Sequence, residues 1–432
     1  MEGVINMKKN KFSLKHYAAK KRMKLFSLGE KSYLIPNNNL HGKDIEIILR
    51  KYNVKTSPNS LTREVITYLH QPVDIHIENL EDGEFYNSVQ KVVFTLLLKN
   101  KDTLSLKLNE LLEVNTFLND RKAGFCRLRD VVAKILVEFY YVYLFGSKPE
   151  SSEVEIFYDN IKDYISAFGF LTLPDTKKRT RCYDLILSKC NDGFIGVLNL
   201  DEKKPLTREE IAKVIMGVFF VTGVLQISEL VSKCVVELAC SNIDICEKIN
   251  KDNSFLKKSI AEALRVHPLF GITNRIIPRD HVLNDNVIKA GTNVLFDFKS
   301  HQMHGFIEPE KFLPERWDVL NENKECFTPF GAGPRKCPAK NISLQVSELI
   351  LSELLKRFEF HSSICNDSFS TSGALVYYSS YSKMSMLKGF KVNISLPVIY
   401  ALDRTEVVYN SIRSIYNTRK VEGILRVGYR GS

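Results

Sequence analysis

The sequence lacks the spacings that mark disulfide frameworks, zinc ribbons and metalloprotease helices. Its nine cysteines are an odd number, no two of them are spaced as CxxC, and none of its nine histidines falls in an HExxH pattern. The opening residues are polar and basic, so we expect no secretory leader. This usage is typical of free thiols in a reducing compartment. We therefore expect a soluble, cytoplasmic protein without structural disulfide bonds.

Long apolar runs and the loops of electron-carrying cofactors are also missing. No run approaches eighteen apolar residues, so we expect no transmembrane anchor. There is no GxGxxG loop for a dinucleotide and no ferredoxin-type cysteine run. The net charge is +11, with a dense basic run between Lys8 and Lys24 but no zinc-finger or RNA-binding signature. We interpret this opening as a solvated tail and expect no nucleic-acid partner.

What the chain does contain is mainly helical patterning. Thr207 and Glu210 form a capping-box pair that opens the longest apolar stretch, which predicts a central helix. Helices are expected at 84–99, 130–145, 151–168, 181–198, 208–240, 254–266 and 340–358, and strands at 32–36, within 272–298 and in pieces up to about 399. The pattern predicts a mainly α protein with small β-sheets (α+β).

The segment from Phe330 to Ala339 reads FGAGPRKCPA and resembles the cysteine loop of the cytochrome P-450 family. The family pattern FxxGxRxCxG is matched except at its last glycine, which is alanine here. The resemblance implies that Cys337 is the axial thiolate ligand of a haem b iron, a ligand that favours O–O cleavage. Gly333 would admit the tight turn that aims amide N–H groups at the sulfur, Arg335 would pair with a haem propionate, and Phe330 would pack beneath the macrocycle.

Two further segments follow the order of the same family. Glu262 and Arg265 are three residues apart, which places them on one helix face, as in the family's ExxR pair. Arg316, within the sequence PERW, would complete this pair as a buried ionic triad that holds the cysteine loop. Arg275 lies between these segments and corresponds to a second arginine for the propionates.

Upstream, the stretch from Asp82 to Tyr86 resembles the start of the family's helix with a WxxxR face. Tyr86 stands at the tryptophan position, Gln90 stands at the arginine position, and Lys91 is one residue away from it. Tyr86 and Lys91 are therefore candidate haem-binding residues.

The predicted central helix departs from the family at its oxygen site. Gly223 matches the family pattern [AG]GxxT and can admit a local widening of the helix. Leu225 and Gln226 stand where the family has an acid and a threonine. That pair relays protons to bound oxygen, and neither an alkyl group nor an amide can titrate. Gln226 and Ser228 remain as candidates for the oxygen or water site.

As a whole, the resemblance implies the mainly α-helical triangular prism of the cytochrome P-450 family over residues 30–400. A basic segment at 1–29 precedes it, and a basic extension at 401–432 is expected to be a surface or partner contact, or to be disordered. As an enzyme, the protein would be a monooxygenase that inserts one oxygen atom of O2 into a small apolar substrate. Electrons would come from NAD(P)H through a separate redox partner.

The replacement of the acid and the threonine leaves two alternatives open. One is a haem-thiolate isomerase, dehydratase or peroxygenase, which needs no proton relay from that pair. The other is a non-catalytic haem-binding or ligand-binding protein. Leu225 and Gln226 motivate both alternatives.

Overall fold

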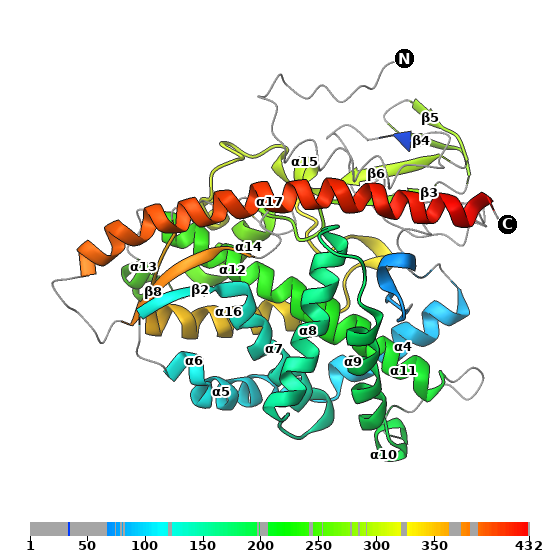
Figure 1. The fold of residues 1–432 in the computed structure, drawn as a ribbon. Helices are drawn as coiled ribbons and strands as arrows, with labels where there is room; N and C mark the ends of the chain where they lie inside the picture. Colours follow the sequence, from blue (N-terminus) through cyan, green and yellow to red (C-terminus); the bar gives the residue numbers. More distant parts are fainter. Residues whose placement is uncertain are drawn as a thin grey trace.

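Figure 1 shows the computed structural model of the chain. The residues that the structure describes are 33–34, 67–73, 75–77, 80, 83–119, 123–196, 198, 206–241, 245–252, 254–276, 279–283, 286–290, 292–320, 326–362, 373–380 and 388–430. The basic segment at 1–29 lies outside the described residues. Of the strand expected at 32–36, β1 (Tyr33–Leu34) is described.

Helices account for most of the described residues, as the patterning predicts. The α-helices are α4 (Glu84–Leu98), α5 (Leu104–Val114), α6 (Thr116–Asn119), α7 (Leu128–Phe145), α8 (Ser151–Phe168), α9 (Thr176–Lys189), α10 (Asp192–Gly196), α11 (Arg208–Ile215), α12 (Val224–Cys240), α13 (Ile245–Lys251), α14 (Phe255–Val266), α15 (Phe298–Met303), α16 (Lys340–Arg357) and α17 (Lys388–Arg430). Short 3-10 turns are η2 (Lys101–Thr103), η4 (Pro314–Asp318) and η5 (Gly333–Arg335), and η3 (Met216–Gly223) is π-helical.

The strands form small sheets beside the helical body (Figure 1). They are β1, β2 (Ala123–Arg127), β3 (Ile272–Ile276), β4 (His281–Leu283), β5 (Asn286–Ile288), β6 (Asn293–Asp297), β7 (Phe358–His361) and β8 (Leu375–Ser380). In the sheet β1-β6-β3, β1 is parallel and β3 antiparallel to β6. The sheet β2-β8-β7 is antiparallel, and β4 pairs with β5. The predicted mainly α fold with small sheets is confirmed.

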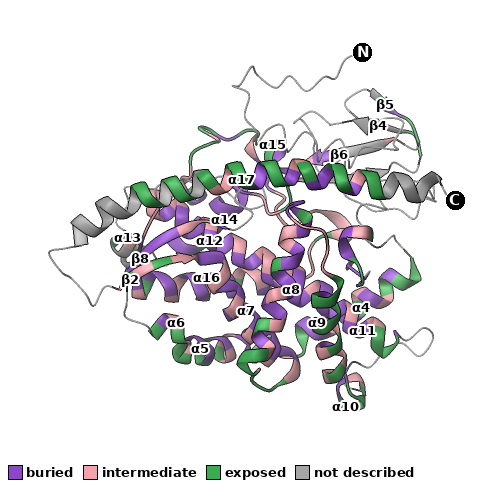
Figure 2. Ribbon diagram, viewed as in Figure 1, coloured by how far each residue is buried: buried purple, intermediate pink, exposed green. Residues whose placement is uncertain are grey.

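The core lies where α7, α12 and α16 pack together, with α5 against both α7 and α16. α7 is apolar on most faces, and its side chains Leu136, Phe139 and Tyr143 are at most 1% exposed. A helix that is apolar all round must lie inside the protein, and Figure 2 shows buried residues concentrated along these helices. α12 contacts both α14 and α16, so the helix of Glu262 and the helix after Cys337 rest on one core.

The central helix predicted at 208–240 is formed by α11, η3 and α12 in succession. Its capping box is present: the Thr207 hydroxyl accepts the Glu210 N–H at 3.2 Å, and the Glu210 carboxylate accepts the Thr207 N–H at 2.8 Å. The sequence predicts no membrane-crossing helix. Judged by length and composition alone, however, this helix is long and apolar enough to cross a membrane. Its most apolar window is 67% buried inside the protein, which explains its apolarity as that of a core helix.

The structure differs from the predicted elements in two places. The helix predicted at 181–198 is divided into α9 and α10, because the Asn191 side chain accepts the Phe194 N–H at 3.0 Å and starts a new helix. The strand-like pieces predicted up to 399 do not extend beyond β8 in the described residues, and 388–399 belongs to α17. This long helix crosses the expected boundary at residue 400 and lies along the outside of the protein (Figure 1).

Candidate functional site

The cysteine loop turns on two glycines. Gly331 has φ +72° and Gly333 has φ +64°, in the left-handed region that favours glycine. The chain doubles back there, and the Cys337 N–H donates to the Phe330 carbonyl at 2.8 Å. α16 begins at Lys340, so the cysteine directly precedes a helix N-terminus, an end that favours a negative charge. Gly333 was expected from the family pattern, whereas Gly331 was not.

Cys337 differs from the fully buried cysteines in its access. The described cysteines are all free thiols: Cys126, Cys182, Cys190, Cys234, Cys240, Cys326 and Cys337. Cys182 and Cys234 are fully buried, and burial raises the pKa of each thiol well above its ordinary value. Such thiols stay protonated and pack as small apolar side chains in the core. Cys337 is partly exposed within a glycine-rich loop.

Arg335 and Tyr86, both predicted to bind the cofactor, lie together. The Arg335 guanidinium carbon is 3.6 Å from the centroid of the Tyr86 ring, a cation–π distance. Its two terminal nitrogens donate to the carbonyls of Ile77 at 3.4 Å and Leu80 at 2.5 Å. Gln90 donates to the Tyr86 hydroxyl at 3.2 Å and fixes the ring from the same helix face. The loop of Cys337 is thereby fastened to α4 and to the segment before it.

The other cofactor candidates are placed differently. Lys91 is exposed on α4, on a different face from Tyr86, so it does not join the Arg335 stack. Phe330 is partly buried and packs against the main core. Arg275 lies in β3 opposite Val294, and its side chain is outside the described part of the structure.

Tyr140 on α7 lies against the central helix at Gly223. Its hydroxyl lies 3.2 Å from the position that a Cβ on Gly223 would take. Burial raises the pKa of Tyr140 first, and the nearby charge of Cys337 and then Tyr143 raise it further. The phenol therefore remains a protonated donor near both Gly223 and Cys337. Sequence analysis missed it, because nothing distinguishes this tyrosine within the apolar run of α7.

The central helix is widened where the family pattern predicted it. η3 is π-helical and ends at Gly223. A Cβ on Gly217, at the other end of η3, would lie 2.7 Å from the Ile75 carbonyl and 3.1 Å from Nδ1 of His76. Only glycine admits that approach, so Gly217 lets the segment 75–77 rest on the widened helix. This glycine carried no family signal in the sequence.

The residues that replace the acid and the threonine come shortly after the π-helical segment along the chain. Leu225 and Gln226 are each partly exposed at the start of α12. Ser228 is fully buried, and its hydroxyl donates to the Leu225 carbonyl at 3.1 Å. The Ser228 proton is thus engaged with the helix backbone, which leaves Gln226 as the more accessible of the two predicted oxygen-site residues.

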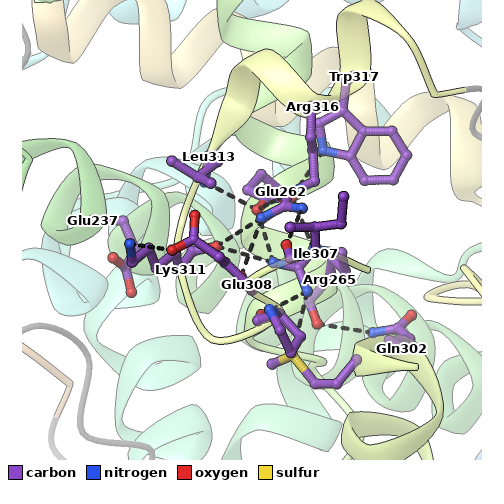
Figure 3. A network of polar contacts seen from close by, with 12 residues as sticks. Glu237, Glu262, Arg265, Gln302, Ile307, Glu308, Lys311, Leu313, Arg316 and Trp317 are labelled. Carbon is purple, nitrogen blue, oxygen red and sulfur yellow. Dashed lines mark hydrogen bonds and ion pairs between the residues drawn. The ribbon is translucent and has the colours of Figure 1, made fainter. Parts of the chain in front are cut away.

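Glu262 on α14 lies at the centre of a polar network (Figure 3). Nη2 and Nε of Arg265 donate to its two oxygens at 2.8 and 2.9 Å, and Nε of Arg316 donates at 2.7 Å. The side chains of Glu262 and Arg265 are 0% exposed, and that of Arg316 is 9% exposed. The structure thus brings together the three residues of the predicted triad.

The network extends beyond the three predicted residues. Nε1 of Trp317 donates to Glu262 at 2.9 Å, and the Leu313 N–H donates at 3.0 Å. Both arginines also donate to the Lys311 carbonyl, Arg265 at 3.1 Å and its partner at 3.2 Å. Glu262 therefore has all its oxygens occupied and ties α14 to the segment that leads into the cysteine loop (Figure 3). Trp317 could have been predicted from its place in PERW.

These residues fit haem. A partly exposed thiol on a glycine turn, with a helix N-terminus behind it, suits an anionic ligand to iron. A guanidinium two residues before the thiol suits a propionate. Gly223, which has no side chain, lies beside the Tyr140 hydroxyl, and the charge of Cys337 contributes to the raised pKa of that tyrosine. Cys337 and Arg335 would hold the group.

Comparisons with known proteins agree with this geometry. The family model described as Cytochrome P-450 matches residues 237–376. Aromatase 2 from Sus scrofa is 24% identical over 385 residues, which cover 82% of this chain and 71% of the relative. Aromatase from Homo sapiens is 22% identical over 375 residues, with 82% and 70% covered. Probable cytochrome P-450 6a19 from Drosophila melanogaster is 31% identical over 186 residues, 37% of each chain.

Solved structures show the same fold. A variant of cytochrome P-450 OleT in complex with arachidonic acid has a TM-score of 0.63 at 14% identity, covering 86% of this chain and 96% of that chain. A variant of cytochrome P-450SP alpha has a TM-score of 0.64 at 17% identity, covering 82% and 92%. With the cysteine loop, the Glu262 network and the widened helix in family order, this chain belongs to the cytochrome P-450 superfamily of haem-thiolate oxidoreductases.

Proposed function

We propose that this protein is a monooxygenase that inserts one oxygen atom of O2 into a small apolar substrate. The reaction converts RH, O2, NAD(P)H and a proton into ROH, water and NAD(P)+, with the electrons delivered by a separate redox partner. One observation carries the proposal: Tyr140 lies beside Gly223 and within electrostatic reach of Cys337. We infer that the thiol and the widened turn of the central helix border one interior region, as oxygen chemistry at a thiolate-bound iron requires.

Haem b would supply the iron at which thiolate donation favours O–O cleavage. The chain's own residues would hold and shield it. Cys337 presents the sulfur from a turn that two left-handed glycines fix. Arg335, held by Tyr86 and by the carbonyls of Ile77 and Leu80, would supply the positive charge that a propionate needs. The Glu262 network holds the preceding segment, so that the loop does not need to be ordered when the cofactor binds.

Proton delivery is where this chain differs from its family. The reaction consumes protons at the oxygen, and Leu225 cannot supply one. Gln226 can hold a water through its amide but cannot change its protonation state. Tyr140 keeps its proton, since burial raises its pKa, and it can orient a water by donating to it. We infer that protons reach the oxygen through water that these two side chains hold, and that this supply is slow.

A second candidate function is peroxide-driven oxygenation by the same thiolate-bound iron. Peroxide brings both oxygen atoms and the reducing equivalents, so neither a redox partner nor an acid beside the oxygen is needed. The observation that favours it is again the pair Leu225 and Gln226. A redox-neutral isomerase or dehydratase, and a non-catalytic binding protein, are compatible with the same two residues.

The test begins with a screen of apolar compounds for substrate-binding shifts in the haem spectrum. Each binder is then incubated with NADPH and a surrogate reductase, or with hydrogen peroxide alone, and product is measured in both. We expect product from the reductase system to exceed that from peroxide. Product from peroxide alone supports the second candidate. Redox-neutral conversion supports an isomerase or dehydratase, and binding without turnover supports a binding protein.

We further propose that the haem domain begins near residue 30 and includes α17, which crosses residue 400, and that the protein works in the cytoplasm. The free thiols of the described cysteines suit a reducing compartment. Intact mass measurement with and without thiol alkylation, on protein from its natural source, would test the redox state. A disulfide between any pair of cysteines would contradict the compartment.

A further inference from the structure

The face of α17 that packs on the protein is polar. Asn410, Ser411, Ser414, Asn417 and Thr418 are each at most 9% exposed. Their spacing of three, four and seven residues places them on one side of the helix. A helix that covers a hydrophobic core normally buries an apolar stripe there, so α17 has its amphipathic character reversed.

Specific polar contacts hold this face. The Asn417 amide donates to the Leu171 carbonyl, in the turn between α8 and α9, at 2.7 Å. Glu406 forms an ion pair with Arg127 at the end of β2. Val421 adds an apolar contact with the small cluster at the end of α8. These contacts fix the rotation of α17 about its axis and leave its other face outside.

The outward face of α17 is apolar and aromatic. The exposed large apolar residues of this helix are Val398, Leu402, Val408, Tyr409, Ile412, Tyr416 and Ile424. They are seven of nineteen such residues in the described part of the chain. Leu402, Tyr409, Ile412 and Tyr416 follow one another at seven, three and four residues, which forms a continuous stripe. They are 53%, 57%, 55% and 67% exposed, so the stripe is open to solvent.

Basic side chains flank this stripe. Arg413, Arg419 and Lys420 are exposed along the same part of the helix. The Arg413 guanidinium lies 5.7 Å from the Tyr409 ring centroid and donates to its hydroxyl at 3.4 Å. Among the acidic side chains described on this helix, Glu406 is paired with Arg127, and the single charge of Glu422 offsets only one of these three cations. The stripe therefore carries a local positive charge within a chain whose net charge is +11.

We propose that the outward face of α17 binds the surface of an anionic lipid bilayer, with the helix lying in the plane of the interface. The apolar stripe would enter the boundary between headgroups and acyl chains, and the flanking cations would contact anionic headgroups. Tyr409 and Tyr416 combine an apolar ring with a polar tip, as side chains at that depth do. This proposal does not rest on the oxygenase activity.

A second copy of the chain fits the surface less well. Two α17 stripes packed face to face would bring Arg413, Arg419 and Lys420 of both copies together, and like charges in contact oppose association. An anionic bilayer removes that conflict, because it supplies apolar contact and opposite charge at once. The positive charge beside the stripe therefore favours an anionic lipid surface over a second copy of the chain.

The test uses the full-length haem-loaded protein and vesicles of phosphatidylcholine, with or without about one third phosphatidylserine. Co-sedimentation should show binding to the anionic vesicles that falls as salt rises. In one variant Tyr409, Ile412 and Tyr416 become serine, and binding should be lost. In a second, Arg413, Arg419 and Lys420 become glutamine. Binding should weaken about a hundredfold, because each basic residue near such a surface contributes about a fivefold change in affinity.

Two matched variants control for general changes in surface character. Leu98, Leu106 and Val114 are 59–61% exposed on α4 and α5, and changing them to serine should leave vesicle binding intact. Lys101, Arg181 and Lys257 are exposed on other elements, and changing them to glutamine should weaken binding far less than the α17 set does. Circular dichroism and the haem spectrum show that each variant is folded.

Three outcomes would overturn the proposal. The first is no sedimentation of wild-type protein with anionic vesicles at low salt. The second is equal binding to neutral and anionic vesicles, which would remove the role of the basic residues. The third is a dimer in sedimentation velocity that the serine variant dissociates, without lipid binding, which would assign the stripe to a second copy.

Discussion

The two sides of the proposed haem site follow the family pattern to different extents. On the cysteine side, Cys337 and Arg335 stand on a loop that turns at two left-handed glycines. Each carboxylate oxygen of Glu262 accepts hydrogen bonds. On the oxygen side, the π-helical widening is present at Gly223, but Leu225 stands in place of the acid. The cysteine side keeps its ligand, its arginine and its triad, whereas the oxygen side keeps the widened helix without the titratable group.

The difference shows that holding the cofactor and delivering protons are separate physical requirements. The triad is a matter of stability, because a buried carboxylate that loses its partners cannot be solvated. Leu225 and Gln226 are at the partly exposed start of α12, so replacing a polar pair there strands no buried charge. A chain can therefore change the oxygen side at little cost to its fold, whereas a change on the triad side affects the whole domain.

The largest effect is expected from Cys337→Ala. Wild-type protein in the ferrous carbonyl state should show the red-shifted Soret band of thiolate ligation, and the variant should lose it completely, because no sulfur remains at the iron. The control is Cys326→Ala, a buried cysteine ahead of the same loop, which should keep the band. An unchanged spectrum in the Cys337 variant would place the iron ligand elsewhere.

Removing Glu262 should have the next largest effect. Glu262→Ala leaves Arg265 buried with no carboxylate, at a cost on the order of 3–5 kcal/mol in the free energy of unfolding. Yield of haem-loaded protein and the denaturant midpoint measure it. Glu247→Ala removes an exposed helix pair with Lys251 and should cost no more than about 0.5 kcal/mol. Similar losses in the two variants would mean that the triad carries no special stability.

The sequence was sufficient to predict the site residues whose roles depend on their local spacing in the chain. Glu262 and Arg265 share a helix face because of their separation, and PERW identifies Arg316 as their partner once the family is known. The reversed amphipathic pattern of α17 shows the limit of such reasoning. Periodicity reports that a helix has two faces, but only tertiary contacts decide which face is buried, and here the polar one is. Its β-branched residues also resemble strand sequence, which led to the wrong prediction up to 399.

Site residues that act through tertiary position were not predictable. Tyr140 matters because α7 carries it against Gly223 and toward Cys337, residues far away along the chain. Gly217 matters because residues 75–77 cross the helix at that point. Neither residue belongs to a local motif, so neither could be recognised until the helices were placed in space.

Restoring the acid and the alcohol tests whether the oxygen side lacks only a proton source. Leu225→Asp with Gln226→Thr should raise the fraction of NADPH electrons that reach product, because a positioned proton donor is typically worth about 10²–10⁴-fold in rate. Product and peroxide are measured together, with Leu225→Asn and Gln226→Val as a matched pair that cannot titrate. A wild-type protein that is already tightly coupled would show that another route delivers protons, and no gain in the double variant would favour the peroxide-driven candidate.

The smallest effect is expected from Tyr140→Phe, which keeps the ring and removes the hydroxyl beside Gly223. Burial and then the charge of Cys337 raise the pKa of this phenol, so it is protonated at any pH where the protein works. It can therefore donate a hydrogen bond but cannot act as a base. Coupling should fall by less than about tenfold, the worth of one hydrogen bond.

Because the phenol does not titrate, the ratio of variant to wild-type coupling should stay constant between about pH 6 and pH 9. The Soret position of the carbonyl complex should shift slightly, since a donor near Gly223 and Cys337 has been removed. Tyr141→Phe is the control: its hydroxyl donates to Glu153 at 3.0 Å on another face of α7, so its loss should leave the spectrum unchanged. A ratio that changes with pH would mean that Tyr140 exchanges its proton, and identical spectra in both variants would remove it from the site.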